Sequence, residues 1–273
     1  MKAIIPAAGF GTRMLPLTKA QPKEMLPVFN RPAMEYVVEE AINAGYREIV
    51  IVTGRTKRAI EDHFDRMPEL EAFLESKGKK EEANMIRKIG EKADIYFVRQ
   101  KEQLGLGHAI LTAKAFVNNE DFAVLLGDDL FIPEALKHMG KDSICVQKIE
   151  GKEIEKKGVV ELDGRRITRL VEKPKYKEAP SQYAIAGRYK LPFEVFRYLE
   201  KTEPGAGGEI QLTDALNALA KEHNLYAYIH KGKVFDIGNM ERWFAANLYF
   251  SYKKAKWARE LIKRVGKYRG KGF

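Results

Sequence analysis

Two glycines, a threonine and two basic residues stand close together near the N-terminus, in the stretch "PAAGFGTRMLPLTKAQPKEMLP". Gly9 and Gly11 allow backbone N–H groups to approach an anion without hindrance from a Cβ atom, and Thr12 adds a hydroxyl group. Arg13 and Lys23 add two positive charges, enough to hold a triphosphate rather than a single phosphate. The pattern predicts a phosphate-binding loop after the strand-like run "KAII"; the alternative is a glycine turn with solvated basic residues.

Two common phosphate-binding loops do not fit this stretch. A Walker A loop has the form G-x-x-x-x-G-K-[S/T], which the stretch does not match. A dinucleotide-binding fingerprint requires a third glycine where Met14 stands, and an acidic residue after the second strand, where "IVTGR" stands. A dinucleotide-dependent oxidoreductase is therefore disfavoured.

Two aspartates stand at the ends of strand-like runs further along the chain. Asp128 follows "FAVLLG", and Asp236 lies in "VFDIGN". The carboxyl ends of strands in an open α/β sheet border the ligand crevice, and Mg²⁺ is typically held by one or two carboxylates plus substrate phosphates. For either aspartate alone a capping role explains the pattern as well, but the pair favours a Mg²⁺ site. For Asp129, beside Asp128, a turn or N-cap role explains the pattern at least as well as a metal role.

The elements that must position these residues alternate between short apolar strands and helical patterns. Strands are expected at 2–6, 48–54, 94–100 and 122–129, and helices at 33–45, 57–64 and 107–116. Residues 66–92 are charged and helix-forming, with no strand character. The alternation predicts an α/β fold with a doubly wound, mostly parallel, Rossmann-like sheet.

The second half of the chain has a different pattern. A β-hairpin is expected over 158–174, with Asp163-Gly164 as its tight turn. Helices at 192–200 and 209–222, strands near 225–230 and 233–236, and a last helix capped by Asn239 are expected to follow. We therefore predict one domain over 1–252 with a small added hairpin and helical region, followed by a basic C-terminal helix or tail over 253–273.

Composition restricts the compartment and the partners. The 273 residues include a single cysteine, Cys145, which cannot form an internal disulfide. No apolar run reaches the ~20 residues of a membrane span, and the glycine motif begins by residue 9, which leaves no room for a signal peptide. A cytoplasmic protein without a membrane partner is expected.

The positive charge is concentrated at the C-terminal end. The chain carries a net charge of +10, of which residues 253–273, with nine Lys or Arg and one Glu, contribute +8. A basic nucleic-acid-binding protein is thus a remote alternative, because the body of the chain is nearly neutral and the tail would bind weakly and without specificity.

The N-terminal stretch resembles the signature of sugar nucleotidylyltransferases, and its "KEMLP" form resembles bacterial-type UTP–glucose-1-phosphate uridylyltransferases. Seven further segments resemble that family in the same order: "VRQKEQLGLGHAI", "GDD", "GVVE", "VEKP", "YAIAGRY", "GGEIQLTDAL" and "KGKVFDIGN". The resemblance extends to about residue 250. It implies the nucleotidyltransferase fold, with residues 1–130 binding mainly the nucleotide and 131–252 mainly the sugar phosphate.

The implied reaction transfers a uridylyl group from UTP to α-D-glucose 1-phosphate and releases pyrophosphate. The attacking phosphate has a second pKa of about 6 and is already dianionic at neutral pH, so no general base is needed. Catalysis then consists of aligning two polyanions and neutralising their charge, with cations and Mg²⁺.

The resemblance also assigns site residues. Arg13 and Lys23 would hold the β- and γ-phosphates, Lys173 of "VEKP" would hold the sugar phosphate, and Asp128 and Asp236 would bind Mg²⁺. The nucleotide-binding set is Ala7, Ala8, Gly9, Gly11, Thr12, Arg13, Lys23, Gln100 and Gly105. The sugar-phosphate-binding set is Gly158, Glu172, Lys173, Gly187 and Glu209.

Some of these roles have alternatives. The Gln100 amide is expected to pair with a pyrimidine edge through one donor and one acceptor, which does not separate uracil from thymine. Lys173 could be a solvated lysine, and Glu209 a charge in the first turn of a helix. His108 is assigned to a helix start or to packing rather than to catalysis.

The nearest rival is a glucose-1-phosphate thymidylyltransferase, which shares the loop, the aspartates and "EKP". The helical insertion at 66–92 and the wording "KEMLP" favour the uridylyltransferases. The resemblance further implies a homodimer or a homotetramer that acts on UTP and glucose 1-phosphate and has no specific nucleic-acid partner. The hairpin over 158–174 is shorter than in many relatives, which affects the rim of the sugar pocket.

Overall fold

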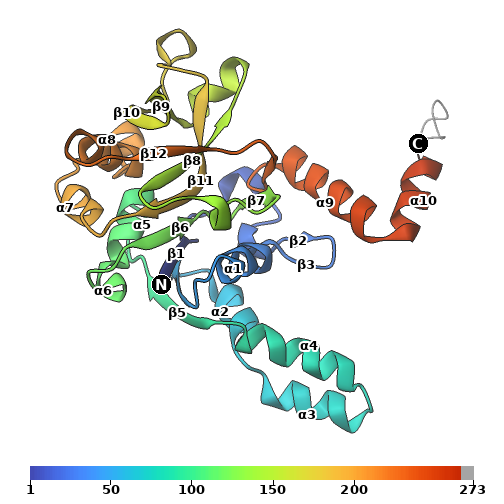
Figure 1. Ribbon diagram of the computed structural model, residues 1–273. Helices are drawn as coiled ribbons and strands as arrows, with labels where there is room; N and C mark the ends of the chain where they lie inside the picture. The colour runs from blue at the N-terminus through green and yellow to red at the C-terminus, as the bar shows by residue number, and fades with distance from the viewer. Residues whose placement is uncertain (266–273) are drawn as a thin grey trace.

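The computed structural model describes residues 1–265, and within them a nine-stranded sheet forms the centre of the molecule (Figure 1). Its strand order is β5-β4-β1-β6-β11-β8-β12-β10-β9. The strands are β1 (Lys2–Pro6), β4 (Glu48–Thr53), β5 (Asp94–Arg99), β6 (Phe122–Leu125), β8 (Ser143–Lys148), β9 (Gly158–Asp163), β10 (Arg166–Glu172), β11 (Tyr183–Leu191) and β12 (Tyr226–Ile229).

The four strands β5, β4, β1 and β6 are parallel neighbours. Three of them, β1, β4 and β6, are almost fully buried apolar runs, as expected for strands covered on both faces. Beyond β6 the sheet is mixed, because β11 runs antiparallel to both β6 and β8. The predicted Rossmann-like sheet is confirmed, with its parallel half in the N-terminal part of the chain.

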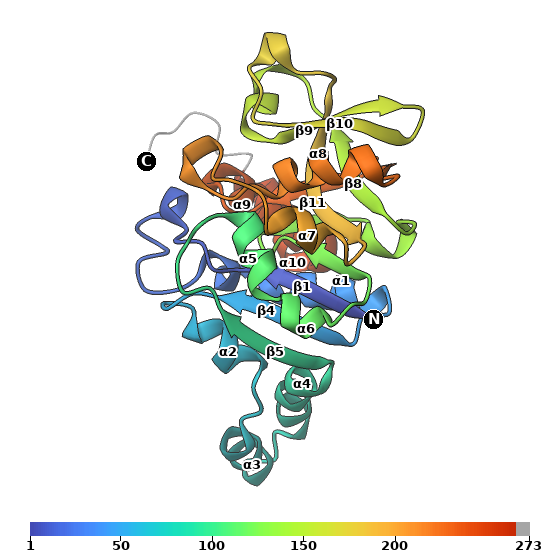
Figure 2. The same cartoon turned by 90° about the vertical axis from the view of Figure 1, so that its left-hand side faces the viewer.

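Helices cover both faces of the sheet (Figures 1 and 2). One layer packs against the core that includes Met34, Ile60 and Phe250, and the other against the core that includes Ile110, Phe196 and Leu216. The first layer consists of α1 (Ala33–Asn43), α2 (Arg58–Phe64) and α9 (Met240–Lys254). The second consists of α5 (Leu106–Thr112), α6 (Lys114–Val117), α7 (Val195–Leu199) and α8 (Leu212–Glu222). This arrangement is the predicted doubly wound fold.

The strand predicted over 122–129 is divided in the structure. β6 ends, the chain turns, and β7 (Asp129–Ile132) starts outside the main sheet. β7 pairs antiparallel with β13 (Lys233–Asp236), with Asp236 opposite Asp129. The two segments that carry the predicted metal ligands are therefore neighbours, although they are far apart in the sequence.

The hairpin β9–β10 forms where it was predicted. The two strands pair antiparallel on either side of the turn, and Gly164 takes a left-handed φ of 60° there. This conformation costs glycine little, because it has no Cβ atom. The short segments β2 (Pro27–Val28) and β3 (Arg31–Pro32) form a second small hairpin after the glycine loop.

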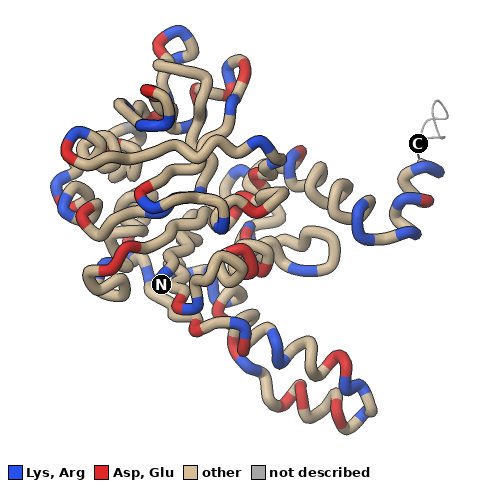
Figure 3. The backbone as a smooth tube through the Cα atoms, in the orientation of Figure 1, with Lys and Arg blue, Asp and Glu red and all other residues tan. Residues whose placement is uncertain are grey.

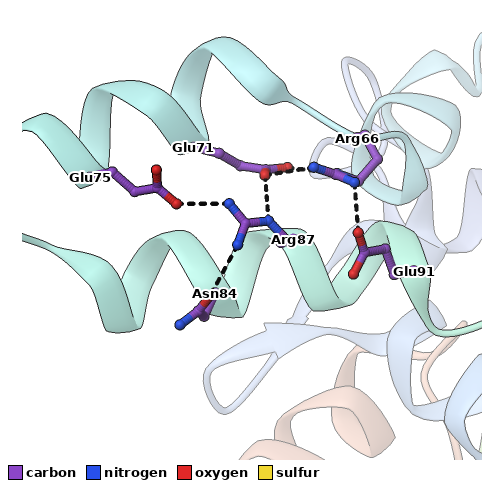
Figure 4. A network of polar contacts seen from close by, with 6 residues as sticks. All are labelled: Arg66, Glu71, Glu75, Asn84, Arg87 and Glu91. Carbon is purple, nitrogen blue, oxygen red and sulfur yellow. Dashed lines mark hydrogen bonds and ion pairs between the residues drawn. The ribbon is translucent and has the colours of Figure 1, made fainter.

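The helical segment at 66–92 projects from the body as two antiparallel helices, α3 (Pro68–Ser76) and α4 (Lys80–Glu91) (Figure 1). Their buried centre is the carboxylate of Glu71, which accepts from Arg66 Nε and Nη2 at 2.7 Å each and from Arg87 Nε at 2.9 Å (Figure 4). Figure 4 also shows Glu75, Asn84 and Glu91 at the outer edges of this network.

The C-terminal helices form an arm that leaves the body on the same side (Figure 1). Asn239 caps α9 as predicted, since its side chain accepts from Arg242 N at 3.1 Å. α9 runs past residue 252 to Lys254, and α10 (Lys256–Val265) follows. The rest of the predicted basic tail, 266–273, lies outside the described residues. Among residues 1–265 no helix is both long and apolar enough to cross a membrane.

Candidate active site

The glycine loop begins where β1 leaves the sheet. Ala7 and Ala8 are buried, and Ala7 N donates to Val52 O of the neighbouring strand at 2.8 Å. Gly11 has a φ of 69°, and its carbonyl accepts from Thr18 Oγ1 at 2.8 Å. A Cβ atom on Gly9 would meet no described atom within 4 Å outside its own chain neighbours. The loop is thus fixed at its base and at Gly11, and open at Gly9, where a ligand can approach the backbone.

Arg13 projects from the short 3₁₀ turn η1 (Thr12–Met14), which follows this loop. Its side chain is 64% exposed, and its Nη1 lies 3.7 Å from Asp236 Oδ2. A Cβ atom on Gly238 would lie 2.9 Å from both Arg13 Nη2 and Asp128 Oδ2, and 3.0 Å from Asp236 Oδ1. The arginine and the two predicted metal ligands therefore converge on the space beside Gly238.

Backbone hydrogen bonds hold the two aspartates in this arrangement. Ile237 N donates to Asp128 O at 2.9 Å, and Gly238 N donates to Asp236 Oδ1 at 3.0 Å. Within residues 1–265, no group of three or more His, Cys, Asp or Glu side chains could hold a metal ion. A pair of carboxylates beside an open phosphate loop suits Mg²⁺, which takes one or two carboxylates and completes its shell with phosphate oxygens and water.

Lys23 lies in the 3₁₀ turn η2 (Lys23–Met25) and forms an ion pair with Asp128 Oδ2. Burial lowers the pKa of Lys23, but the carboxylates of Asp128 and Glu24 outweigh it and raise the pKa above its ordinary value. Burial raises the pKa of Asp128, but Lys23 and Arg13 outweigh it and lower the pKa below its ordinary value. Both groups therefore stay charged at neutral pH.

A second buried ion pair anchors the same turn. Glu24 is 2% exposed and lies 3.0 Å from Lys57 Nζ, which is also buried. Removing one partner of such a pair costs about 3–5 kcal/mol, because the other charge is left buried without compensation. The "KE" of "KEMLP" thus has two parts: Lys23 faces the site, and Glu24 fixes the turn.

A cavity of about 390 Å³ opens beside the two aspartates. It collects residues from both halves of the chain, including six that the sequence predicted. These are Arg13, Asp128, Gly158, Glu172, Gly187 and Asp236. The cavity also contains cations that were not predicted, namely Lys156, Lys157 and Arg242. A site with several carboxylates, Asp128 and Asp236 among them, and several cations suits an anionic ligand that brings its own metal ion.

The far wall of the cavity contains the predicted sugar-side residues. Glu172 Oε2 accepts from Thr213 Oγ1 at 2.6 Å. A Cβ atom on Gly158 would lie 2.8 Å from that hydroxyl oxygen and 2.9 Å from Ile185 Cδ1. Gly187 has a φ of 72°, and a Cβ atom there would collide with Asp129 Oδ2. Both glycines are therefore needed for close packing under the cavity.

Lys173 lies at the rim and is not among the described residues that line the cavity. Its backbone takes a left-handed φ of 46°, and its N donates to Lys157 O at 3.1 Å. Its Nζ lies 3.3 Å from Glu172 Oε1, and its side chain is 45% exposed. Lys173 is thus paired with Glu172, a residue of the cavity wall, whereas Lys157 lines the cavity itself.

Gln100 is buried after β5 and is hydrogen-bonded to the next loop. Its Nε2 donates to Gly105 O at 3.1 Å and lies 3.0 Å from His108 Nδ1. Because Nε2 carries the amide hydrogens, His108 Nδ1 is the acceptor. The expected donor to a base is therefore engaged within the protein, and Oε1 is the atom left to accept from a ligand. His108 lies in the first turn of α5.

Glu209 lies before α8 rather than inside it, because the predicted helix over 209–222 begins only at Leu212. The preceding residues are extended and pair with the loop after Gln100. Ile210 N donates to Leu104 O at 2.7 Å, and Gly107 N donates to Ile210 O at 2.9 Å. A first-turn helix charge is thus wrong for Glu209, whose Oε2 instead accepts from Gln211 Nε2 at 3.1 Å.

Gly105 is explained by the same pairing. It has a φ of 99°, and a Cβ atom there would lie 2.7 Å from Glu209 Cβ and 2.9 Å from Ile210 O. The loop beside Gln100 and the segment that leads into α8 therefore lie in contact. This contact joins the predicted nucleotide side of the site to its sugar side.

Residues 2–251 match the family model described as nucleotidyl transferase. The chain belongs to the nucleotidyl transferase family. The UTP–glucose-1-phosphate uridylyltransferase 1 of Staphylococcus saprophyticus is 46% identical to it, over 97% of this chain and 99% of that protein. The predicted family resemblance is confirmed.

Solved structures of nucleotidyl transferases agree with this assignment. The UTP-bound UGPase from Acinetobacter baumannii has a TM-score of 0.89 and 37% identity, and the match covers 98% of this chain and 99% of that one. A UDP-glucose pyrophosphorylase complexed with UDP-glucose has a TM-score of 0.82 and 42% identity, over 93% of this chain and 99% of that one. The match covers nearly the whole of each protein.

Four candidate site residues of this nucleotidyl transferase were missed from the sequence, namely Gly238, Lys156, Lys157 and Arg242. Gly238 follows Asp236 in "VFDIGN" and has no chemistry of its own; only its position between Arg13 and the aspartates gives it a role. Lys157 and Arg242 stand in lysine-rich and mixed stretches, where nothing distinguishes them from surface charges. The available signal for Lys157 was its place directly before the predicted hairpin, in "KKGVVE".

Proposed function

We propose that this chain transfers the uridylyl group of UTP to α-D-glucose 1-phosphate, giving UDP-glucose and pyrophosphate. The observation that carries the proposal is the convergence of Arg13, Asp128 and Asp236 around Gly238, at one end of the 390 Å³ cavity. The proposal is supported by relatives named UTP–glucose-1-phosphate uridylyltransferase and by similar structures described with UTP or UDP-glucose bound.

In this proposal the glycine loop holds the triphosphate. Backbone N–H groups at Gly9 and Gly11 face the phosphates, and the exposed Arg13 closes on the β- and γ-phosphates. Lys23 keeps its charge beside them because Asp128 and Glu24 stabilise it. These cations stabilise the negative charge that builds up on the departing pyrophosphate.

Asp128 and Asp236 would hold a Mg²⁺ ion together with phosphate oxygens of UTP. That ion would neutralise charge at the α-phosphate, where the bond forms. The protein's own contribution is to hold both aspartates in place through the backbone N–H groups of Ile237 and Gly238. The sugar phosphate, already dianionic, then attacks in line without a general base.

The glucose part of the acceptor is expected to lie against Glu172, Gly158 and Gly187, with residues 131–252 forming most of its pocket and 1–130 most of the nucleotide site. Lys173 is assigned to the sugar phosphate, and would leave Glu172 to reach it. Lys157 lines the same cavity and is a second candidate for that phosphate.

Gln100 is proposed to accept the N3–H of the base through Oε1. Thymine presents the same N3–H group, so Gln100 separates both from cytosine but not from each other. Glucose-1-phosphate thymidylyltransferase activity therefore remains the second candidate function.

We also propose a homodimer or homotetramer in the cytoplasm. The arm exposes Phe244, Trp257 and Val265, whose side chains are 58%, 62% and 61% exposed. Figure 3 shows Lys and Arg at several places along this arm. A stripe of large apolar residues on two helices that leave the body suits contact with another subunit, and light scattering of the purified chain tests it.

Pyrophosphate release tests the function. The assay contains Mg²⁺ and glucose 1-phosphate, with UTP, dTTP, CTP, ATP or GTP in separate reactions. We expect UTP to be used at least about tenfold better than the others. Equal or better use of dTTP would assign the chain to the thymidylyltransferases, and release with none of the five would refute the proposal.

A further inference from the structure

The guanidinium group of Arg188 lies buried under the loop that carries Asp128. Arg188 belongs to β11, "YAIAGRYKL", a central strand of the sheet. Its side chain is charged, yet the residue is 0% exposed. The pairing of β11 with β8 is irregular between Ile185 and Tyr189, and Gly187 has a positive φ there. Arg188 therefore stands within the irregular part of β11.

Within the described residues, all five N–H donors of Arg188 are engaged. Nε and Nη2 donate to Glu40 Oε2 at 3.1 and 2.9 Å. Nη1 donates to Leu126 O at 3.1 Å and to Gly187 O at 3.0 Å, and Nη2 donates to Asp129 O at 2.6 Å. The carbonyls of Leu126 and Asp129 bracket Asp128 in the chain, so the guanidinium fixes both ends of that turn.

Glu40, in α1, is the counterion, and both of its carboxylate oxygens accept hydrogen bonds. It is 3% exposed, and its Oε1 accepts from Ala135 N and Leu136 N at 3.0 Å each. The Arg188 guanidinium also lies 4.4 Å from the centre of the Phe131 ring in β7. The pair therefore connects α1, β11, β7 and the segment after β7.

We infer that Arg188, held by Glu40, is a positioning residue for the catalytic carboxylate Asp128. The inference rests on the proposed function, because it gives Asp128 a role in binding the metal ion. Arg188 is not among the described residues that line the cavity with Asp128 and Asp236. It acts through the backbone on either side of Asp128, as outer residues do when they orient a metal ligand.

A lysine at this position cannot replace the arginine. Lysine keeps the charge for Glu40, but its three donors radiate from one atom and cannot reach two separate carbonyls and the carboxylate together. An ion pair with a merely structural role would tolerate Arg188→Lys once the protein has folded. If Arg188 positions Asp128, Arg188→Lys should impair the site, because the Leu126 and Asp129 carbonyls would lose their donors.

Binding of Mn²⁺ in the presence of UTP, without sugar phosphate, provides the test. Free Mn²⁺ is measured by electron paramagnetic resonance for the full chain, for Arg188→Lys and for the nearly isosteric Glu40→Gln. Val195→Ala in α7 is the matched control, because it truncates the core on the opposite face of the sheet. Thermal unfolding and circular dichroism verify that each variant is folded.

We expect Arg188→Lys to weaken Mn²⁺ binding and to lower kcat about tenfold or more, with KM for glucose 1-phosphate little changed. Glu40→Gln is expected to act in the same direction and decides the question if Arg188→Lys does not fold. Val195→Ala should keep the affinity of the full chain within about twofold at a comparable loss of stability. Equal Mn²⁺ affinity in all four proteins would overturn the inference, whereas failure of the unaltered chain to bind Mn²⁺ with UTP would refute the proposed function instead.

Discussion

At the scale of residues, the site consists of a few charged groups held by glycines and by backbone hydrogen bonds. Arg13, Asp128 and Asp236 meet beside Gly238, and Lys23 pairs with Asp128. The types of these four charged residues, and the strand ends on which the aspartates stand, could be predicted from the sequence. The position of Gly238 between them could not, because it depends on the pairing of β7 with β13.

Gly238 offers a direct test of this arrangement. Gly238→Ala places a methyl group about 3 Å from Arg13, Asp128 and Asp236, so these groups must move apart. Because a misplacement of about 1 Å at reacting groups costs about 100-fold in rate, we expect Gly238→Ala to lower kcat by up to about 100-fold. Gly140→Ala is the control, because a Cβ atom there meets no described atom within 4 Å. Normal turnover by Gly238→Ala in a pyrophosphate assay would mean that the space beside this glycine is not the reaction site.

The lysines beside the cavity separate two accounts of phosphate binding. Lys173→Ala is expected to raise KM for glucose 1-phosphate about tenfold or more and to leave KM for UTP nearly unchanged, because it loses one charged contact to the acceptor. Lys157→Ala serves as the comparison, since Lys157 lines the cavity and Lys173 lies at its rim. If Lys157→Ala raises KM for glucose 1-phosphate more than Lys173→Ala does, Lys157 is the residue that binds the sugar phosphate. If Lys173→Ala raises KM for UTP and for glucose 1-phosphate equally, the role of Lys173 is contradicted.

At the scale of elements, buried ion pairs join helices that the main sheet does not connect. Glu35 of α1 lies 3.4 Å from His63 Nε2 at the end of α2 and 3.4 Å from Lys92 Nζ after α4. Burial alone would raise the pKa of Glu35, but His63, Lys92 and Arg31 outweigh it and lower the pKa to about 2. These contacts fix the base of the projecting helical hairpin against the body.

The pH dependence of stability follows from the sign of this shift. The folded pKa lies below the ordinary value of 4.5, so the stabilisation is complete above about pH 4.5 and is lost as the pH falls toward 2. Glu35→Gln is therefore expected to lower Tm at pH 7. Its difference from the unaltered chain should shrink steadily between pH 4.5 and pH 2 in calorimetry. A difference in Tm that does not depend on pH over that range would assign the effect to packing rather than to charge.

The parallel strands could be predicted because burial on both faces requires nearly continuous apolar runs. β11 could not, because "YAIAGRYKL" contains a glycine and an arginine that are unusual in a central strand. Arg188 is acceptable there only because Glu40 and the carbonyls of the Asp128 loop satisfy it. The sequence predicts that the helix starts at residue 209, but α8 starts at Leu212. The residues before Leu212 pair with the loop after Gln100, a contact that local sequence does not reveal.

At the scale of the whole molecule, the fold places two halves of one site on opposite sides of a single cavity. The parallel strands β1 and β6 bring the glycine loop and Asp128 to one edge of the sheet, and the hairpin β9–β10 supplies Gly158 and Glu172 from the other half. The order of the motifs predicts that the first half binds mainly the nucleotide and the second mainly the sugar phosphate, and this assignment stays a prediction. The cations of the cavity wall other than Arg13 could not be predicted, because they stand in stretches rich in charge. Only the three-dimensional structure shows that they line the cavity.

The central claim is that Asp128 and Asp236 form the metal site of a uridylyl transfer, and one measurement tests it most directly. Pyrophosphate release from UTP and glucose 1-phosphate is measured over a range of Mg²⁺ concentrations for Asp128→Asn and Asp236→Asn. Asp62→Asn, at an exposed aspartate on α2, is the control. We expect both site variants to fold and to lose at least about 100-fold in kcat, and the control to keep full turnover. Near-normal, Mg²⁺-dependent turnover in either site variant would contradict the account.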